Sequence, residues 1–260
     1  MSTGWEARLK ISTTRQEPTS GSHCEQSDEK VDPKGHRTGV DVFRDRTDAG
    51  ERLAQEVQRR ALDVDLILAL PRGGVPVAAP VARAQGLPLD VLLVRKMGLP
   101  ASTELAMGAI ASGGLHVLNQ DVLDAAKVDE ETVRLVMERE EAELARREEL
   151  YRGNAPASDL SGRRVLLVDD GLATGATMRV AVRAVAEGGA RAIYVAVPVS
   201  APEILKTLEA QVDELICLLQ PTNFQSVGSW YQNFEQVDDE EVREVLGSHR
   251  QATGSSPKHS

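Results

Sequence analysis

Short runs of apolar residues alternate with amphipathic stretches along most of the chain. Runs such as 65–70, 164–168 and 192–199 carry consecutive apolar side chains, which is typical of strands buried on both faces of a parallel sheet. This alternation predicts an α/β fold, with a largely parallel twisted sheet and helices on both faces. The expected strands are 65–70, 89–94, 164–168, 192–199 and 214–219, and the expected helices are 46–62, 75–85, 129–152, 175–187 and 201–210.

The stretch between the second and third expected strands departs from this alternation. Residues 95–108 show no clear period and predict a loop. Residues 109–118, which surround Ser112-Gly113-Gly114, predict a β-hairpin. The helix expected at 129–152 is long and amphipathic, and it belongs to a helical insertion at 121–152.

The two ends of the chain lack residues that could form a core. Residues 1–40 contain eight hydrophobic residues, whereas 41% of the whole chain is hydrophobic. A segment this poor in apolar side chains cannot offset the entropy lost on ordering. We therefore expect a disordered N-terminal tail at 1–40, a single domain at 41–246 and a second disordered tail at 247–260.

Charge and composition exclude several classes of protein. The chain carries 40 acidic and 30 basic residues, a net charge of −10, so a basic surface for nucleic acid is not expected. Cys24 and Cys217 cannot build a disulfide framework, and no Cys/His cluster has zinc-site spacing. No apolar run is as long as a membrane span, and the N-terminus lacks the apolar core of a secretory signal. These features predict a cytoplasmic protein.

The segment 165–177 carries the most informative chemistry. Here a buried strand ends in two adjacent carboxylates, Asp169 and Asp170, and a run of small residues then opens a helix. Such a run can surround a phosphate with backbone N–H groups, hydroxyls and the helix dipole, whereas adjacent carboxylates suit neutral hydroxyls or a hydrated Mg²⁺. The segment predicts a site for a sugar with a phosphate and a vicinal diol, and a plain strand-to-helix turn is the alternative. The small residues are Ala173, Thr174, Gly175, Ala176 and Thr177.

This segment resembles the phosphoribosyl pyrophosphate motif of the type I phosphoribosyltransferases. The resemblance covers roughly residues 43–219 and extends to a group of uncharacterised members with Pro-Arg-Gly-Gly early in the chain. It implies that Asp169 and Asp170 contact the ribose hydroxyls and that residues 173–177 hold the 5′-phosphate. It also implies Mg²⁺ as cofactor, bound near the two acids mainly through the ligand and water.

Two further segments follow expected strands and supply cations. Arg72 offers a forked cation for phosphate, and Gly73 and Gly74 let the backbone approach a ligand. The resemblance implies that this loop binds pyrophosphate. Arg95 and Lys96 would neutralise the charge of the departing pyrophosphate, and residues 97–108 resemble the flexible lid of the family. The alternatives are a plain turn at 71–74 and solvated surface bases at 95–96.

Two positions depart from the better-known subfamilies. Ala173 stands where hypoxanthine-type members carry an acid, and Ala106 stands where adenine-type members carry a glutamate. The acceptor base is therefore left open.

Aromatic residues gather near the C-terminus. Phe224, Trp230, Tyr231 and Phe234 make up half of the eight aromatics in the chain. The resemblance implies a hood at 221–246 that stacks on a nucleobase, with Phe224, Trp230 and Tyr231 as candidates. Packing of a terminal segment onto the sheet is the alternative.

The resemblance implies transfer of the phosphoribosyl group of phosphoribosyl pyrophosphate to a nitrogen nucleophile, expected to be a nucleobase, with release of pyrophosphate. Catalysis by Arg72, Lys96, Asp169 and Asp170 would consist of positioning and charge stabilisation. A non-catalytic regulatory protein that binds the same compound or a nucleotide is the alternative, which Ala173 and Ala106 favour. A homodimer is left open.

Overall fold

The computed structural model describes residues 30–31, 37–38, 42–99, 102–153 and 155–254. The chain divides into two units, Met1–Asp41 and Val42–Ser260. In the first unit β1 (Lys30–Val31) pairs antiparallel with β2 (Arg37–Thr38). The rest of the tail predicted at 1–40 lies outside the described residues.

A five-stranded parallel sheet forms the centre of the second unit, in the order β10-β9-β8-β3-β4. The neighbouring strands β3 and β8 lie inside the sheet and are almost wholly buried. This sheet confirms the fold class that the apolar runs predict. Its strands are β3 (Leu66–Ala69), β4 (Leu89–Val91), β8 (Arg164–Val168), β9 (Ala192–Val199) and β10 (Glu214–Leu219).

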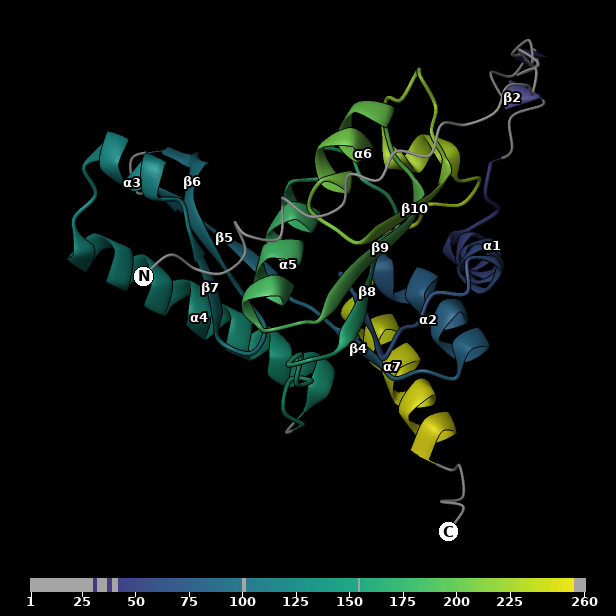
Figure 1. The fold of residues 1–260 in the computed structure, drawn as a ribbon, viewed down its shortest axis with the longest axis horizontal. Helices are drawn as coiled ribbons and strands as arrows, with labels where there is room; N and C mark the ends of the chain where they lie inside the picture. Colours follow the sequence, from purple (N-terminus) through teal and green to yellow (C-terminus); the bar gives the residue numbers. More distant parts are fainter. Residues whose placement is uncertain (1–29, 32–36, 39–41, 100–101, 154, 255–260) are drawn as a thin grey trace, which may run out of the picture. The chain divides into compact units, whose positions relative to one another are not determined.

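Helices cover both faces of this sheet (Figure 1). On one face lie α1 (Arg46–Arg59), α2 (Gly74–Gln85) and α7 (Asp239–Gly254), and on the other lie α5 (Ala176–Glu187) and α6 (Pro202–Glu209). A short 3₁₀ helix, η2 (Val227–Trp230), precedes α7. None of the described helices combines the length and the apolar character that a membrane span requires.

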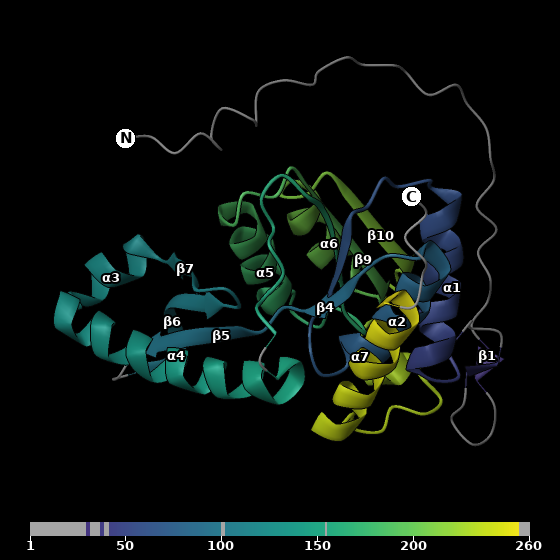
Figure 2. The same cartoon turned by 90° about the horizontal axis from the view of Figure 1, so that it is seen from below.

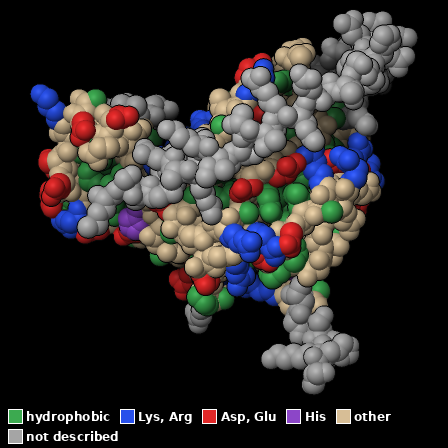
Figure 3. Space-filling model, in the orientation of Figure 1, with side chains coloured by type: hydrophobic (Ala, Val, Ile, Leu, Met, Phe, Trp, Pro, Cys, Tyr) green, Lys and Arg blue, Asp and Glu red, His purple; other side chains and the backbone are tan. Residues whose placement is uncertain are grey.

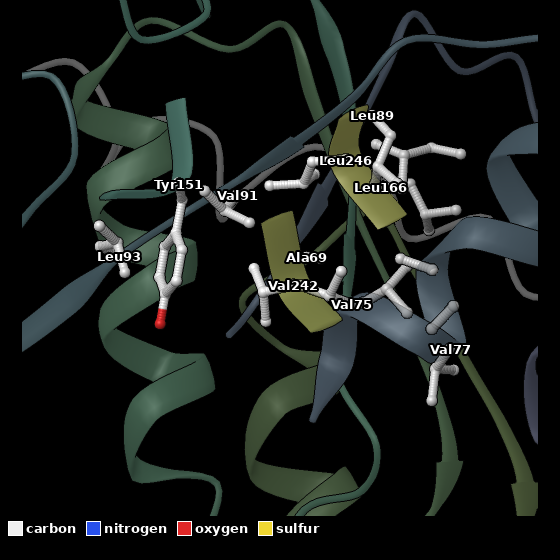
Figure 4. Packing of buried hydrophobic residues seen from close by; sticks show 14 of the residues in the cluster. Ala69, Val75, Val77, Leu89, Val91, Leu93, Tyr151, Leu166, Val242 and Leu246 are labelled. Atoms are coloured by element: carbon white, nitrogen blue, oxygen red, sulfur yellow. The ribbon is translucent and has the colours of Figure 1, made fainter. Parts of the chain in front are cut away.

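Successive strand residues alternate between two cores, as the pleat of a strand requires. In β3, Ile67 and Ala69 pack in the cluster that includes α1, α2 and α7, whereas Leu66 and Leu68 pack in the cluster that includes α5 and α6. Figure 4 shows the first cluster, where side chains of α2 and α7 gather around the sheet. This double burial explains why the strands read as continuous apolar runs.

A second sheet follows β4 and contains three antiparallel strands, β5 (Val94–Leu99), β6 (Ser102–Ala111) and β7 (Leu115–Leu118). The β6–β7 pair confirms the predicted hairpin, but the loop predicted at 95–108 is wrong. Met97 and Met107 are 0% exposed and pack in one cluster with Val136 of the following long helix. The segment that resembles a flexible lid is therefore built from paired strands in this structure.

The insertion predicted at 121–152 forms two helices, α3 (Gln120–Ala126) and α4 (Glu130–Arg152). The Asp129 side chain caps α4 by accepting the Thr132 N–H at 2.7 Å. Figures 1 and 2 both show α4 running along the strands β5–β7. At its end, the buried Arg152 donates from Nε to Asp90 Oδ1 at 2.8 Å, which ties α4 to β4.

The C-terminal helix extends further than the sequence indicates. α7 continues to Gly254, so the disordered tail predicted from residue 247 begins too early. The reason is burial: His249 is 4% exposed, and its Nε2 lies 2.8 Å from the Leu87 carbonyl oxygen. The predicted tail at 255–260 lies outside the described residues.

Candidate functional site

The loops that follow β3 and β8 touch each other, because these strands are neighbours in the sheet. A Cβ at Gly73 would lie 2.0 Å from Asp170 Oδ2, and a Cβ at Gly74 would lie 2.7 Å from the Val168 carbonyl oxygen. Position 74 therefore requires glycine, because the obstacle is backbone, whereas a side chain at position 73 would displace the Asp170 carboxylate. The peptide bond between Pro71 and Arg72, at the start of this loop, is cis. The structure brings the two segments singled out in the sequence to one place.

The acidic pair at the end of β8 is half-buried. Asp169 Oδ1 accepts the backbone N–H of Asp170 at 2.9 Å. Burial raises the pKa of Asp169 well above its usual value, and the charge of Asp170 raises it further. Burial also raises the pKa of Asp170, against the lowering effect of Arg46. Partly desolvated carboxylates of this kind favour partners that donate hydrogen bonds or carry positive charge.

Arg46, which the sequence did not single out, is the cation nearest this pair among the described ion pairs. Its Nε donates to Asp170 Oδ2 at 2.8 Å, and its Nη1 donates to the Glu235 carbonyl oxygen at 2.7 Å. Its guanidinium carbon lies 3.8 Å from the centroid of the Phe234 ring. In the sequence Arg46 looks like the exposed first residue of a helix, and its acidic partner is 124 positions away. No local pattern could have revealed this contact.

The turn predicted to hold a phosphate opens α5. Gly175 caps the helix with φ +66°, and a Cβ there would lie 2.7 Å from Ile204 Cγ2. The Thr174 hydroxyl accepts the Ala176 N–H at 3.3 Å, and both Thr174 and Thr177 are exposed. Arg179, one turn into the helix, donates to the Thr174 carbonyl oxygen at 3.0 Å. Exposed hydroxyls, a helix N-terminus and a nearby cation suit an anionic ligand. The exposed Ala173 precedes this turn.

Arg72 reaches from the glycine loop towards the start of α7. Its Nη1 lies 3.9 Å from Asp239 Oδ1, and the Tyr151 hydroxyl donates to the same carboxylate oxygen. Burial, followed by Asp239, raises the pKa of Tyr151 to about 12, so the phenol keeps its proton. The Arg72 side chain is 38% exposed and therefore accessible to a ligand.

The two cations of β5 point in different directions. Consecutive strand residues face opposite sides of a sheet. Arg95 pairs with Glu140 of α4, with Nε 2.7 Å from Oε2, whereas Lys96 is exposed. Although burial opposes ionisation, hydrogen bonds from Arg139 and Arg95 hold the pKa of Glu140 below its usual value. Arg95 thus anchors α4 in this structure, which does not fit the pyrophosphate role predicted for it, and Lys96 remains the candidate.

The C-terminal aromatic residues differ in how deeply they are buried. Trp230 is 3% exposed and Tyr231 is 7% exposed. The Tyr231 ring contacts Phe234, with centroids 4.9 Å apart, and its hydroxyl donates to the Asp170 carbonyl oxygen at 2.6 Å. Buried rings offer no free face to a base, so stacking does not fit Trp230 or Tyr231, and packing of the terminal segment does. Phe224 is half-buried and remains a candidate.

The glycine loop, the acidic pair and the turn that opens α5 all follow strands of one parallel α/β sheet, at the carboxyl ends where such sheets bind their ligands. The family model of the phosphoribosyl transferase domain matches residues 43–232. The chain belongs to this family, and the family resemblance found in its motifs is confirmed.

Two relatives from Mycobacterium tuberculosis strains, both named "Putative phosphoribosyl transferase", are 42% identical over 201 residues. This match covers 77% of the chain but 45% of each relative, so the chain spans about half the length of these proteins. The crystal structure of the protein TT1426 from Thermus thermophilus is also 42% identical, with a TM-score of 0.71. That match covers 79% of this chain and 97% of the other.

Proposed function

We propose that this protein binds phosphoribosyl pyrophosphate where β3 and β8 end, and transfers its phosphoribosyl group to a nitrogen atom of a nucleobase. The contact between the loop Gly73-Gly74 and Asp170 is the observation that carries this proposal. It sets a backbone that can approach pyrophosphate beside carboxylates that can accept hydrogen bonds from a sugar diol.

In this mechanism the chain acts by binding and by charge. Asp169 and Asp170 accept hydrogen bonds from the ribose hydroxyls, and the turn 173–177 holds the 5′-phosphate. The bond between the anomeric carbon and pyrophosphate breaks with its electron pair going to the pyrophosphate oxygen, while the nitrogen lone pair forms the new bond. The proton of the base nitrogen passes to water or to the released pyrophosphate. Arg72 and Lys96 stabilise the negative charge that develops on the leaving group.

Mg²⁺ fits this site as an ion carried by the ligand. Among the described residues no group of three or more His, Cys, Asp or Glu could hold a metal. Two carboxylates alone suit a cation that keeps most of its ligands from water and phosphate oxygens. Asp169 and Asp170 would hold it through water, and the ion would supply positive charge next to pyrophosphate.

Binding can be tested by thermal unfolding. Phosphoribosyl pyrophosphate with Mg²⁺ should stabilise the fold by about 2.7 kcal/mol at about 100 times its dissociation constant, since it binds the folded state. Ribose 5-phosphate should stabilise it less, because it lacks pyrophosphate contacts. If neither compound shifts the melting temperature, the proposed site is wrong.

A second candidate function is a non-catalytic regulator that binds the same compound. Ala173 and Ala106 favour it, because neither side chain can move the proton of a base. Pyrophosphate release, measured with a panel of purine and pyrimidine bases, separates the two functions. Release with one base identifies the acceptor, whereas tight binding without release with any base supports the regulator.

A further inference from the structure

The Arg46 side chain joins the acidic pair, the glycine loop and the C-terminal segment. It donates hydrogen bonds to Asp170 and to the carbonyl oxygen of Glu235. A Cβ added at Gly73 would lie 3.3 Å from its Nε. The side chain is 12% exposed, and the ring of Phe234 lies against its guanidinium group. Contacts from these separate segments leave the guanidinium little freedom.

The geometry of the ion pair leaves part of the Asp170 carboxylate available. Arg46 donates through Nε to Oδ2, and its Nη1 is used by Glu235 rather than by the second carboxylate oxygen. The ion pair with Arg46 therefore engages Oδ2 and leaves Oδ1 outside it. A carboxylate has about four acceptor sites, so Oδ1 can accept a hydroxyl while Oδ2 stays bound to Arg46. A bidentate pair would have used one acceptor site on each oxygen.

We propose that Arg46 is a positioning residue: it orients Asp170 for the sugar hydroxyls and so determines how strongly the site prefers a ribose phosphate over phosphate alone. This inference rests on the proposed function, because it assigns Asp170 to the sugar. It adds a residue outside the motif segments, held in place by Phe234 and Glu235.

A structural role for Arg46 makes a different prediction. If the ion pair only stabilises the fold, its loss lowers the fraction of folded protein and weakens every ligand equally. If Arg46 orients Asp170, its loss weakens binding of the sugar more than binding of phosphate. The ratio of the affinities for ribose 5-phosphate and inorganic phosphate therefore separates the two roles.

The experiment measures both affinities by calorimetry in the full chain, without Mg²⁺, for the wild type, Arg46→Met and Arg59→Met. Arg59 is a matched control, since it lies at the other end of α1 and pairs with Glu56 on the surface. We expect Arg46→Met to reduce the ratio at least about tenfold, the value of one hydrogen bond to a charged group. Inorganic phosphate should bind within about threefold of wild type, and Arg59→Met should match wild type in both.

Arg46→Lys covers the case in which Arg46→Met does not fold, because lysine keeps the charge but lacks the planar fork. It should fold and show a reduced ratio. A wild-type ratio in whichever variant folds would overturn the positioning role and leave the proposed function standing. Failure of the wild type to prefer ribose 5-phosphate over phosphate would overturn both.

Discussion

Burial and the neighbouring Asp170 both raise the pKa of Asp169, so the folded protein disfavours the charged form of this carboxyl. In the unfolded chain the same carboxyl titrates near its ordinary value, about 3.9. A group whose pKa is raised by folding contributes stability below its unfolded pKa and loses that contribution as pH rises through the folded pKa. At neutral pH, therefore, the Asp169 carboxyl lowers the free energy of unfolding.

Asp169→Asn should consequently stabilise the protein. We expect the free energy of unfolding at pH 7 to rise by about 0.5–2 kcal/mol, typical of removing strain at a functional site, and the gain to shrink as pH falls towards 4. Urea unfolding at several pH values measures this. The affinity for ribose 5-phosphate should fall at least about tenfold.

Asp170→Asn is the comparison for this variant, because it also loses the charged partner of Arg46. It should show no comparable gain in stability. Loss of stability in Asp169→Asn with unchanged sugar binding would identify Asp169 as a turn residue without a ligand role.

The predictability of these residues depends on how local their partners are. Asp169, Asp170 and the turn after them lie within a few positions of each other, so one segment of sequence carries the signal. Arg46, by contrast, contacts Asp170 and Phe234, which lie far along the chain. A single arginine at the start of a helix has no pattern that distinguishes it from a solvated charge.

At the scale of secondary structure elements, the neighbouring residues Arg95 and Lys96 of β5 have different surroundings: Arg95 pairs with Glu140 of α4, and Lys96 is exposed. Lys96→Met should lower the affinity for pyrophosphate about tenfold and change stability by less than about 0.5 kcal/mol. Arg95→Met should leave pyrophosphate affinity unchanged and destabilise the fold by about 1–3 kcal/mol, because the buried Glu140 loses a donor. Calorimetry with pyrophosphate and urea unfolding measure the two effects. The opposite assignment of effects would return Arg95 to the ligand site.

The same strand explains why residues 95–108 were predicted as a loop. Strands buried on both faces show unbroken apolar runs, and such runs predict the strands of the parallel sheet correctly. β5 buries Met97 and Leu99 towards one side, while Lys96 is exposed on the other. With Gly98 between the buried residues and Arg95 paired to a charge on α4, the period of two is hidden in the sequence.

At the scale of the whole molecule, the two ends of the chain should respond differently to deletion. Removing residues 1–40 should leave the melting temperature within about 1 °C, because their composition cannot build a core. Removing 247–260 should lower it by several degrees, at about 2–4 °C per kcal/mol, because the buried His249 is lost.

Removing 255–260 alone is the control for the second deletion, since it keeps all of α7. A large loss of stability on removing 1–40 would show that the N-terminal unit packs on the second unit.

On the face shown in Figure 3, acidic and basic side chains are interspersed. The cytoplasmic location and a homodimer stay predictions.

The contacts that complete the site come late in the chain, and this has a consequence for protein synthesis. A nascent chain that has emerged as far as Leu219 contains all five strands of the parallel sheet, together with Arg46, Arg72 and Asp170. It still lacks Glu235 and Asp239, which contact the side chains of Arg46 and Arg72, and Tyr231, which donates to the backbone carbonyl of Asp170. All five strands therefore leave the ribosome before the residues that complete the proposed site, and a chain that stops at Leu219 carries the motif without the contacts that orient its side chains.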